Sequence, residues 1–383
     1  MDKHWLNPIL TESLPKSMLD RAVGLRSKAD ALLLGLAPET AKCVARLLRV
    51  TNAYHSNLIE GEHTDPSEVV EAMGLPLREQ LNDLAARHVG TQELLERALR
   101  LRAVDFKDMF EPGLISVIHR RLFSRLDSES GSAVPGAFRK GASEEVAVGT
   151  HVAPAPELVI PMLKHLQWGF GCIKDPDRRL IAVLANHHRL AFVHPFLDGN
   201  GRVTRLITHL QLAQLGLHPQ LWSLARGLYQ KREEYYSALA KADRAREGDL
   251  DGRGQLSQKH YFAFIEFMLE VCHEQVDYMT EALGLKQIHE RVTHAFNSNL
   301  NLNAGVRPGD AETVKALLTK GSLQLEEFKI LAGLQDLQAE AALNRMIDLG
   351  LVCRRSSRPY ALEPAIPVWL AQELFPNLHT TRP

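Results

Sequence analysis

The sequence has little of what several protein classes require. Its four cysteines, Cys43, Cys172, Cys272 and Cys353, form no CxxC pair, which argues against a disulfide framework and against a thiolate zinc site. We therefore expect reduced thiols in the core of a cytoplasmic protein. No apolar run approaches the roughly 18 residues that a membrane span needs. The N-terminal segment has no basic stretch followed by an apolar one, so we expect no signal peptide and no membrane partner.

The chain also has no surplus of either charge. Lys and Arg number 45 and Asp and Glu number 46, which gives a formal net charge of −1. A global electrostatic attraction to nucleic acid or to an anionic membrane is therefore not expected, although a local patch is not excluded. Hydrophobic residues make up 45% of the 383 residues, enough for the core of an ordinary globular protein. The length indicates two or three domains, at roughly 100–200 residues each.

The spacing of apolar residues predicts a mainly α-helical protein. Segment 38–59 is long, amphipathic and free of internal Gly and Pro, as is typical of a helix. Residues 131–156 differ, because they are rich in Gly, Ala, Ser and Pro and contain a short alternating stretch. We expect an exposed β-hairpin there, which we call the flap. Further helices are expected at 80–104, 113–126, 155–170, 178–192, 202–215, 229–246 and 259–295.

A polar, loop-like segment at 296–310 predicts a domain boundary. The C-terminal segment beyond this boundary resembles a winged helix-turn-helix module. Its would-be recognition helix, 336–349, has one Arg against Asp336, Glu340 and Asp348, whereas a helix that binds phosphates is usually more basic. DNA binding is therefore left open but not favoured, and contact with a protein is preferred. The module comprises helices 311–320, 324–332 and 336–349, then two short strands around a basic tip with Arg354, Arg355 and Arg358.

The segment HPFLDGNGRVTR, residues 194–205, joins two predicted helices and carries the densest set of reactive side chains. Gly199 and Gly201 can take left-handed backbone angles without a steric penalty. Successive N–H groups in such a loop, at the start of a helix, form an anion site. Arg202 and Arg205 are three residues apart, so their guanidinium groups lie near one face and suit phosphate oxygens.

Two more side chains of this segment suit a nucleotide. Asp198 is a hard carboxylate that can hold Mg²⁺ beside phosphates, and His194 is a base whose ordinary pKa lies near neutrality. Together these residues predict a polyphosphate site with a metal ligand and a base. The alternative is an ordinary turn with an ordinary histidine. The adjacent His187 and His188 are expected on the helix surface.

The same segment resembles the signature of the Fic family, HxFx[D/E]GNGRxxR. The resemblance extends over roughly residues 40–295 and implies a Fic-type helical bundle with a short β-hairpin flap. We expect an N-terminal helical region at 1–105 with an inhibitory helix at 38–60, a catalytic core at 106–295 and a winged-helix-like domain at 296–383. The signature is matched at His194, Phe196, Asp198, Gly199, Asn200, Gly201, Arg202 and Arg205.

Most Fic proteins are adenylyltransferases, which move AMP from ATP to a Ser, Thr or Tyr hydroxyl of a protein and release pyrophosphate. The resemblance implies that His194 deprotonates the hydroxyl and that Asp198 holds Mg²⁺. It implies that Arg202 binds the α- and β-phosphates and Arg205 the γ-phosphate. The expected partner is a target protein or the enzyme itself, and a homodimer is expected. The implied nucleotide-binding residues are Gly199, Asn200, Gly201, Arg202, Arg205, Tyr235 and Tyr236.

Two further segments fit the resemblance. The stretch with Tyr235, Tyr236 and Asp243 is similar to the family's adenine-pocket wall. Either tyrosine could equally be a core aromatic, and Asp243 stands where relatives often have Asn. The flap would pair with the target's backbone by strand addition, or it is a surface hairpin without a partner. The residues expected to dock the target are Val146, Val148 and His151.

The end of segment 38–59 resembles the inhibitory motif of the family, [S/T]xxxE[G/N]. Ser56 and Glu60 are four residues apart and share a helix face, and Gly61 suits the helix end. A Glu60 carboxylate paired with Arg205 would occupy the guanidinium group that the γ-phosphate needs. ATP would then bind with its α-phosphate misaligned. The motif therefore predicts an enzyme that inhibits itself.

Two other functions stay open from the sequence. One is a different transfer on the same fold, such as phosphorylation or UMP or phosphocholine transfer. The complete GNGRxxR string with Asp198 favours ATP in its usual orientation, because both arginines then have phosphates to bind. The other is a regulator that senses nucleotide while its winged helix binds DNA or a protein partner.

Overall fold

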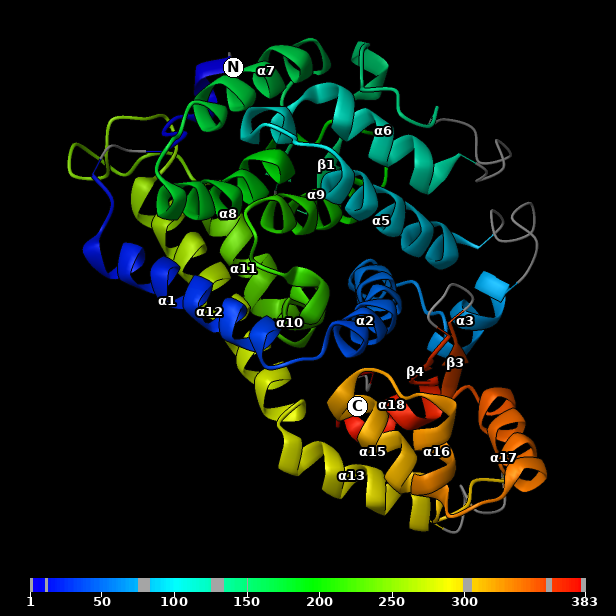
Figure 1. The fold of residues 1–383 in the computed structure, drawn as a ribbon. Helices are drawn as coiled ribbons and strands as arrows, with labels where there is room; N and C mark the ends of the chain where they lie inside the picture. The colour runs from blue at the N-terminus through cyan, green and yellow to red at the C-terminus, as the bar shows by residue number, and fades with distance from the viewer. Residues whose placement is uncertain are drawn as a thin grey trace. The chain divides into compact units, whose positions relative to one another are not determined.

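The computed structural model describes residues 3–10, 13–74, 83–124, 134–149, 151–298, 305–355 and 360–379 (Figure 1). The chain folds into two compact units. The first comprises residues 1–28, 52–219 and 223–275, and the second comprises 29–51, 220–222 and 276–383. The domain limits expected from the sequence, 1–105, 106–295 and 296–383, stay a prediction. Among the described helices, none is long and apolar enough to cross a membrane.

Helices dominate the first unit. Four helices of this unit, α1, α2, η6 and α12, also have residues in the second unit. Its helices are η1 (Lys3–Leu6), α1 (Lys16–Leu34), α2 (Pro38–Ile59), α3 (Pro66–Gly74), α5 (Leu84–Leu101), η2 (Phe106–Phe110), α6 (Pro112–Phe123), η4 (Ala142–Glu144), η5 (Pro156–Leu158), α7 (Val159–Gly171), α8 (Pro176–Val193), α9 (Asn200–Gln214), η6 (Pro219–Leu221), α10 (Leu224–Gln230), α11 (Arg232–Ala242) and α12 (Gln258–Ala282).

Helix α8 is buried along most of its length in the first unit. It begins with Pro176 behind the N-cap Asp175, whose carboxylate accepts the N–H of Arg178 at 2.8 Å, a favourable helix start. It packs beside α7 and α9, as Figure 1 shows. The sequence-based expectation that His187 and His188 lie on the helix surface is wrong, because both are completely buried. Burial on all sides leaves α8 no solvent-facing stripe in this stretch.

The predicted flap is present as a short hairpin. Strand β1 (Ala147–Val148) pairs antiparallel with β2 (His151–Val152), with Val148 opposite His151. Ala147, Val148 and Val152 are exposed, whereas His151 is half-buried. The hairpin thus presents apolar side chains to solvent and turns one imidazole toward the helical body.

The second unit contains the C-terminal helices and a second hairpin. The predicted single helix 259–295 is wrong, because α12 ends at Ala282 and a new helix begins at Leu285. Gly284 between them is extended, with φ −57° and ψ 131°. The elements after α12 are α13 (Leu285–Asn297), α15 (Asp310–Lys320), α16 (Leu325–Ala332), α17 (Asp336–Asp348), β3 (Val352–Arg354), β4 (Leu362–Pro364) and α18 (Val368–Leu374).

Three helices followed by an antiparallel β3–β4 pair match the predicted order of elements. The winged-helix identity of this part stays a prediction, and Arg358 of the predicted basic tip lies outside the described residues. The cysteines follow expectation only in part. Cys43 and Cys272 are buried thiols, but Cys353 is half-buried and Cys172 is exposed.

Candidate active site

The turn between α8 and α9 has an unusual backbone. His194 ends α8 in the left-handed conformation, with φ 47° and ψ 63°, which is uncommon for a residue with a side chain. Gly199 takes φ 76° at the N-terminus of α9, and a Cβ atom there would overlap the ring of Phe123. Glycine is therefore required at 199, both for its backbone angle and for the close approach of Phe123.

Asn200 holds this turn in shape. Its Oδ1 accepts the N–H of Phe196 at 2.9 Å and its Nδ2 donates to the carbonyl of Phe196 at 2.8 Å. The buried ring of Phe196 stacks on His119, with the ring centroids 3.9 Å apart. The Nδ1 of His119 accepts the N–H of Gly136, so its Nε2 donates to the carbonyl of Asp198 at 3.1 Å. The loop is therefore fixed by buried side chains before any ligand is present.

A cavity of about 380 Å³ opens beside the turn. It brings together nine of the predicted site residues, including the candidate base, the glutamate predicted to be inhibitory and part of the flap. Asp198, Gly199, Arg202, Ser56 and Val146 do not line it. The cavity is lined by Glu60, Val148, Gly149, His151, Ala191, Phe192, His194, Asn200, Gly201, Thr204, Arg205, Tyr235, Tyr236, Leu239, Ala240 and Asp243.

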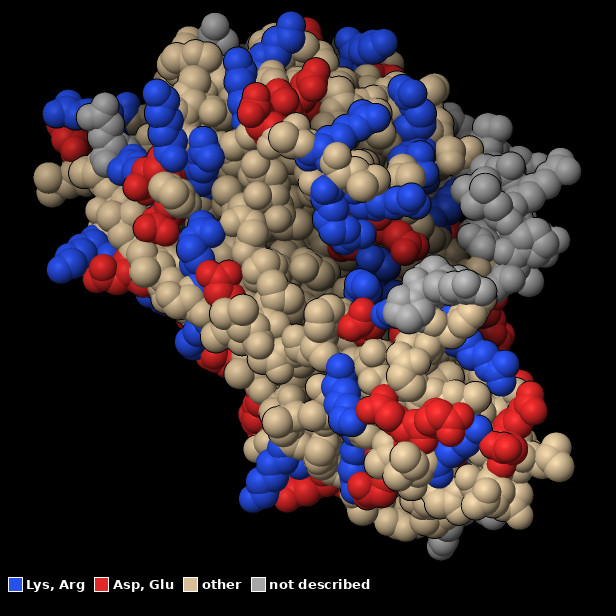
Figure 2. Space-filling model, viewed as in Figure 1, with Lys and Arg blue, Asp and Glu red and all other residues tan. Residues whose placement is uncertain are grey.

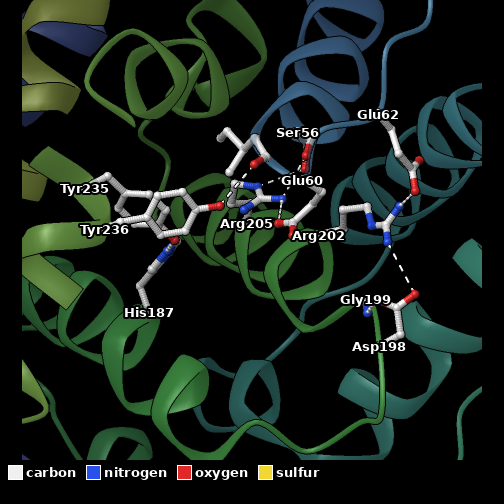
Figure 3. A network of polar contacts seen from close by, with 11 residues as sticks. Ser56, Glu60, Glu62, His187, Asp198, Gly199, Arg202, Arg205, Tyr235 and Tyr236 are labelled. Carbon is white, nitrogen blue, oxygen red and sulfur yellow. Dashed lines mark hydrogen bonds and ion pairs between the residues drawn. The ribbon is translucent and has the colours of Figure 1, made fainter. Parts of the chain in front are cut away.

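Arg205 is buried and bound to the end of α2 (Figure 3). Its guanidinium donates to the Ser56 hydroxyl at 2.9 Å, to the Ser56 carbonyl at 2.8 Å and to Glu60 Oε1 at 2.6 Å. Burial alone would raise the pKa of Glu60, but the charge and hydrogen bond of Arg205 outweigh it and lower that pKa. Glu60 is thus ionised at neutral pH and holds the guanidinium group that the sequence assigned to a phosphate.

The cap of α2 sets where Glu60 points. Gly61 has φ 85°, its N–H donates to the carbonyl of Leu58, and the N–H of Glu62 donates to the carbonyl of Asn57, each at 3.0 Å. This glycine-terminated helix end turns the chain sharply. A Cβ atom at Gly201 would overlap the Glu60 carboxylate. Glycine at 201 therefore gives the carboxylate room against α9.

Arg202 lies on the other side of the α9 N-terminus, as Figure 3 shows. It forms an ion pair with Glu62 at 2.8 Å and a longer one with Asp198 at 3.6 Å, and its guanidinium lies 4.9 Å from the ring centroid of Phe123. The Asp198 side chain is 69% exposed. Glu62 was not among the residues expected from the sequence, although its place just after the Glu60-Gly61 helix end was a usable signal.

The imidazole of His194 is neutral at physiological pH. Burial, with added repulsion from His151 and Arg139, lowers the pKa of His194 to about 4. One nitrogen of a neutral imidazole ring is always an acceptor. His194 is therefore in the form that can take a proton.

The two tyrosines contribute differently to the cavity. The Nδ1 of His187 lies 2.8 Å from the Thr208 hydroxyl, which itself donates to the Thr204 carbonyl. The Nε2 of His187 therefore accepts from the hydroxyl of buried Tyr235, also at 2.8 Å. Tyr236 is 42% exposed and donates to the Ile59 carbonyl at 3.0 Å. Tyr235 belongs to both the core and the cavity wall.

Asp243 connects the flap to α8. Its carboxylate lies 3.1 Å from His151 Nδ1 and 2.9 Å from His188 Nε2. Burial opposes its ionisation, but the hydrogen bonds from His151 and His188 prevail and lower the pKa of Asp243. Arg139, in the loop that leads into β1, also contacts the chain on both sides of the β1–β2 hairpin, and this was not expected from the sequence. A charged residue in a Gly-rich loop normally indicates a solvated surface, so the sequence carried no signal for its burial.

Residues 110–212 match the family model described as the Fic/DOC family. "Protein adenylyltransferase Fic" of Nematostella vectensis is 29% identical over 246 residues, which are 61% of this chain and 52% of that protein. The protein of the same name from Drosophila virilis is 24% identical over 311 residues, 79% of this chain and 57% of that protein. The chain thus spans little more than half the length of these curated relatives.

Two solved structures share the fold. A Fic family protein from Desulfovibrio desulfuricans G20 superposes with a TM-score of 0.51 at 20% identity, over 92% of this chain and 97% of that one. A Fic domain containing signaling protein from Bacteroides thetaiotaomicron VPI-5482 gives a TM-score of 0.51 at 16% identity, over 68% and 97%. The mainly helical fold expected from the sequence is confirmed by these likenesses.

Proposed function

We propose that this chain, which carries a Fic/DOC family domain at residues 110–212, is a protein adenylyltransferase that moves AMP from ATP to a protein hydroxyl. The observation that supports this most is the cavity lined by both the neutral imidazole of His194 and the guanidinium of Arg205. A base and a phosphate-binding cation at one cavity suit phosphoryl-type transfer. The names of the curated relatives agree with this chemistry.

In the proposed reaction, His194 accepts the proton of a Ser, Thr or Tyr hydroxyl. The hydroxyl oxygen then forms a bond to the α-phosphorus of ATP, and the bond to the β-phosphate oxygen breaks, so that pyrophosphate leaves. Arg205 and the N–H groups at the start of α9 bind phosphate oxygens. Arg202 would do the same once it separates from Glu62. Tyr235 and Tyr236 would form the wall of the pocket that holds the adenine ring of ATP.

The carboxylate of Asp198 suits the Mg²⁺ ion that the proposed reaction needs together with ATP. Among the described residues, no group of three or more His, Cys, Asp or Glu side chains is placed to hold a metal. Mg²⁺ typically takes one or two carboxylates together with substrate phosphates and water, so one exposed Asp198 carboxylate fits such an ion better than a pre-built metal centre. When bound, the ion would neutralise phosphate charge.

We further propose that the structure is the inhibited form. Arg205 directs hydrogen bonds to the Ser56 hydroxyl, the Ser56 carbonyl and the Glu60 carboxylate. The γ-phosphate would have to displace the Glu60 carboxylate from this guanidinium. ATP bound without that contact would present its α-phosphate in the wrong position for His194.

Glu62 is expected to add a weaker restraint through Arg202. We predict that Glu62→Gln raises automodification by roughly two- to fivefold, because the Glu62 side chain is 48% exposed and such ion pairs contribute at most about 1 kcal/mol. Incorporation of labelled AMP measures the effect. Glu71→Gln, at an exposed position on α3, is the matched control. Equal rates for both variants would remove Glu62 from the inhibitory arrangement.

Intact mass after incubation with MgATP separates the candidate functions. A gain of one AMP moiety by the chain or by a target in lysate supports adenylyl transfer. A gain of one phosphate indicates phosphorylation. An unchanged mass, even for a variant without Glu60, favours a regulator that only senses nucleotide.

The charges of the C-terminal helices argue against DNA as a partner. Arg345 of α17 binds Asp310 through both carboxylate oxygens, at 2.7 and 2.8 Å, and Lys329 of α16 pairs with Glu326 and Asp336. These cations are thus engaged within the unit. Figure 2 shows acidic and basic side chains interspersed over α16 and α17 instead of a basic patch.

We therefore predict no gel shift of random-sequence duplex DNA by the full chain, even at low salt. Non-specific DNA binding depends on free cations and weakens steeply with salt. A shift that disappears as salt is raised would contradict this prediction. The expected homodimer and the cytoplasmic location stay predictions.

A further inference from the structure

We propose that Arg139 is a positioning residue, which fixes the His194 backbone and the two ends of the flap in one arrangement. The proposal rests on the proposed function of His194 as the base. Arg139 lies between α6 and β1, does not line the cavity, and is only 2% exposed. A fully buried guanidinium needs a strong structural reason, because its desolvation is costly.

The hydrogen bonds of Arg139 supply that reason. Its guanidinium donates to four backbone carbonyls. Its own N–H donates to a fifth carbonyl, that of Pro195, at 3.0 Å. The four guanidinium bonds run to His194 at 2.8 Å, to Val193 at 3.2 Å, to Pro154 at 3.0 Å and to Glu144 at 3.1 Å.

These carbonyls belong to three separate places in the fold. Val193 and His194 end α8, Glu144 precedes β1, and Pro154 follows β2. One side chain therefore joins the residue that carries the base to the chain on both sides of the hairpin. A change in the position of the hairpin would therefore shift the backbone of His194 through this guanidinium.

The end of α8 needs such a partner. The last carbonyls of a helix have no donor within it, and a cation near them also interacts favourably with the helix dipole. The left-handed backbone of His194 is unfavourable for a residue with a side chain and persists only when its surroundings hold it. The planar guanidinium can serve several carbonyls at once, whereas a lysine ammonium acts as a compact point charge.

Arg139 also acts on the imidazole by its charge. Three titratable groups influence His194: His151 and Arg139 lower its pKa, and Glu60 raises it. Removing the Arg139 charge should therefore raise the pKa of His194 from about 4 toward its ordinary value. This consequence separates a positioning role from mere support of the fold.

The first test compares Arg139→Met and Arg139→Lys in a Glu60→Gly background. We expect Arg139→Met to lower the rate of AMP transfer by roughly tenfold to a hundredfold, the loss typical of a displaced catalytic group, with the KM for ATP little changed. Arg139→Lys keeps the positive charge but loses the planar guanidinium that bonds several carbonyls at once, so an intermediate rate is expected.

The matched control is Arg179→Met. Arg179 lies near the other end of α8, donates to the Ile173 carbonyl at 2.7 Å and lies 4.8 Å from the Phe106 ring centroid. The Arg179→Met variant should have a lower melting temperature without a comparable loss in the rate of AMP transfer. A rate loss in Arg139→Met no larger than in Arg179→Met would overturn the proposal.

The second test does not depend on activity. The ¹³Cε1–H signal of His194, assigned by its loss in His194→Ala, is titrated in histidine-labelled protein. The pKa of His194 should rise in Arg139→Met and stay unchanged in Arg139→Lys. An unchanged pKa in Arg139→Met would overturn the electrostatic part. If the Glu60→Gly protein transfers nothing, the proposed function fails, while this titration still tests the effect of Arg139 on His194.

Discussion

Glu60→Gly is expected to raise the rate of AMP transfer by roughly tenfold to more than a hundredfold. The substitution removes the 2.6 Å contact with Arg205, and a hydrogen bond between charged groups contributes about 1.5–3 kcal/mol. Since about 1.4 kcal/mol corresponds to a factor of ten, release of the guanidinium accounts for the range. Incorporation of labelled AMP, with intact mass to identify the adduct, measures the effect.

A second substitution at the same position tests the mechanism. Glu60→Gln keeps the length of the side chain and removes its charge, so it should activate less than Glu60→Gly. Mild acid should not relieve the wild-type inhibition. The pKa of Glu60 lies below its ordinary value because Arg205 stabilises the carboxylate against the cost of burial, so the ion pair persists until the pH falls through that lowered pKa. Equal rates for wild type and Glu60→Gly would refute inhibition by this residue.

His194→Ala in the Glu60→Gly background is expected to lower transfer by roughly a hundredfold to ten-thousandfold, the usual contribution of a general base. The phosphate-binding turn is held by Asn200 and Phe196, so ATP should still bind. Single-turnover rates and nucleotide binding, measured on the same protein, separate the two effects. His289→Ala in the second unit, where His289 lies 2.9 Å from the Thr319 hydroxyl, is the matched histidine control.

The pH dependence gives an independent check on His194. Because burial, His151 and Arg139 lower its pKa to about 4, the imidazole is already neutral at pH 6. Transfer by Glu60→Gly should therefore show no acid limb from this group between about pH 6 and 8, and should fall only as the pH approaches its pKa. Substantial transfer by the His194→Ala variant would mean that another group takes the proton.

Local sequence accounts for much of the fold and for the centre of the candidate site. The helix predicted at 38–59 has those limits in the structure, since its amphipathic spacing and the Gly61 stop act within a few residues. The His194–Arg205 string likewise predicts a left-handed turn and a helix start, because glycine backbone freedom and helix N-termini are local properties. The contact of Glu60 with Arg205 was expected from the family resemblance.

The tertiary structure decided what lies between segments distant in sequence. The burial of His187 and His188, the link from Asp243 to the flap, the pairing of Glu62 with Arg202 and the four carbonyls around Arg139 all depend on which elements pack together. A charged residue in the sequence looks the same whether water or a backbone carbonyl solvates it. Only the fold determines which, because burial is a property of the neighbours and not of the residue itself.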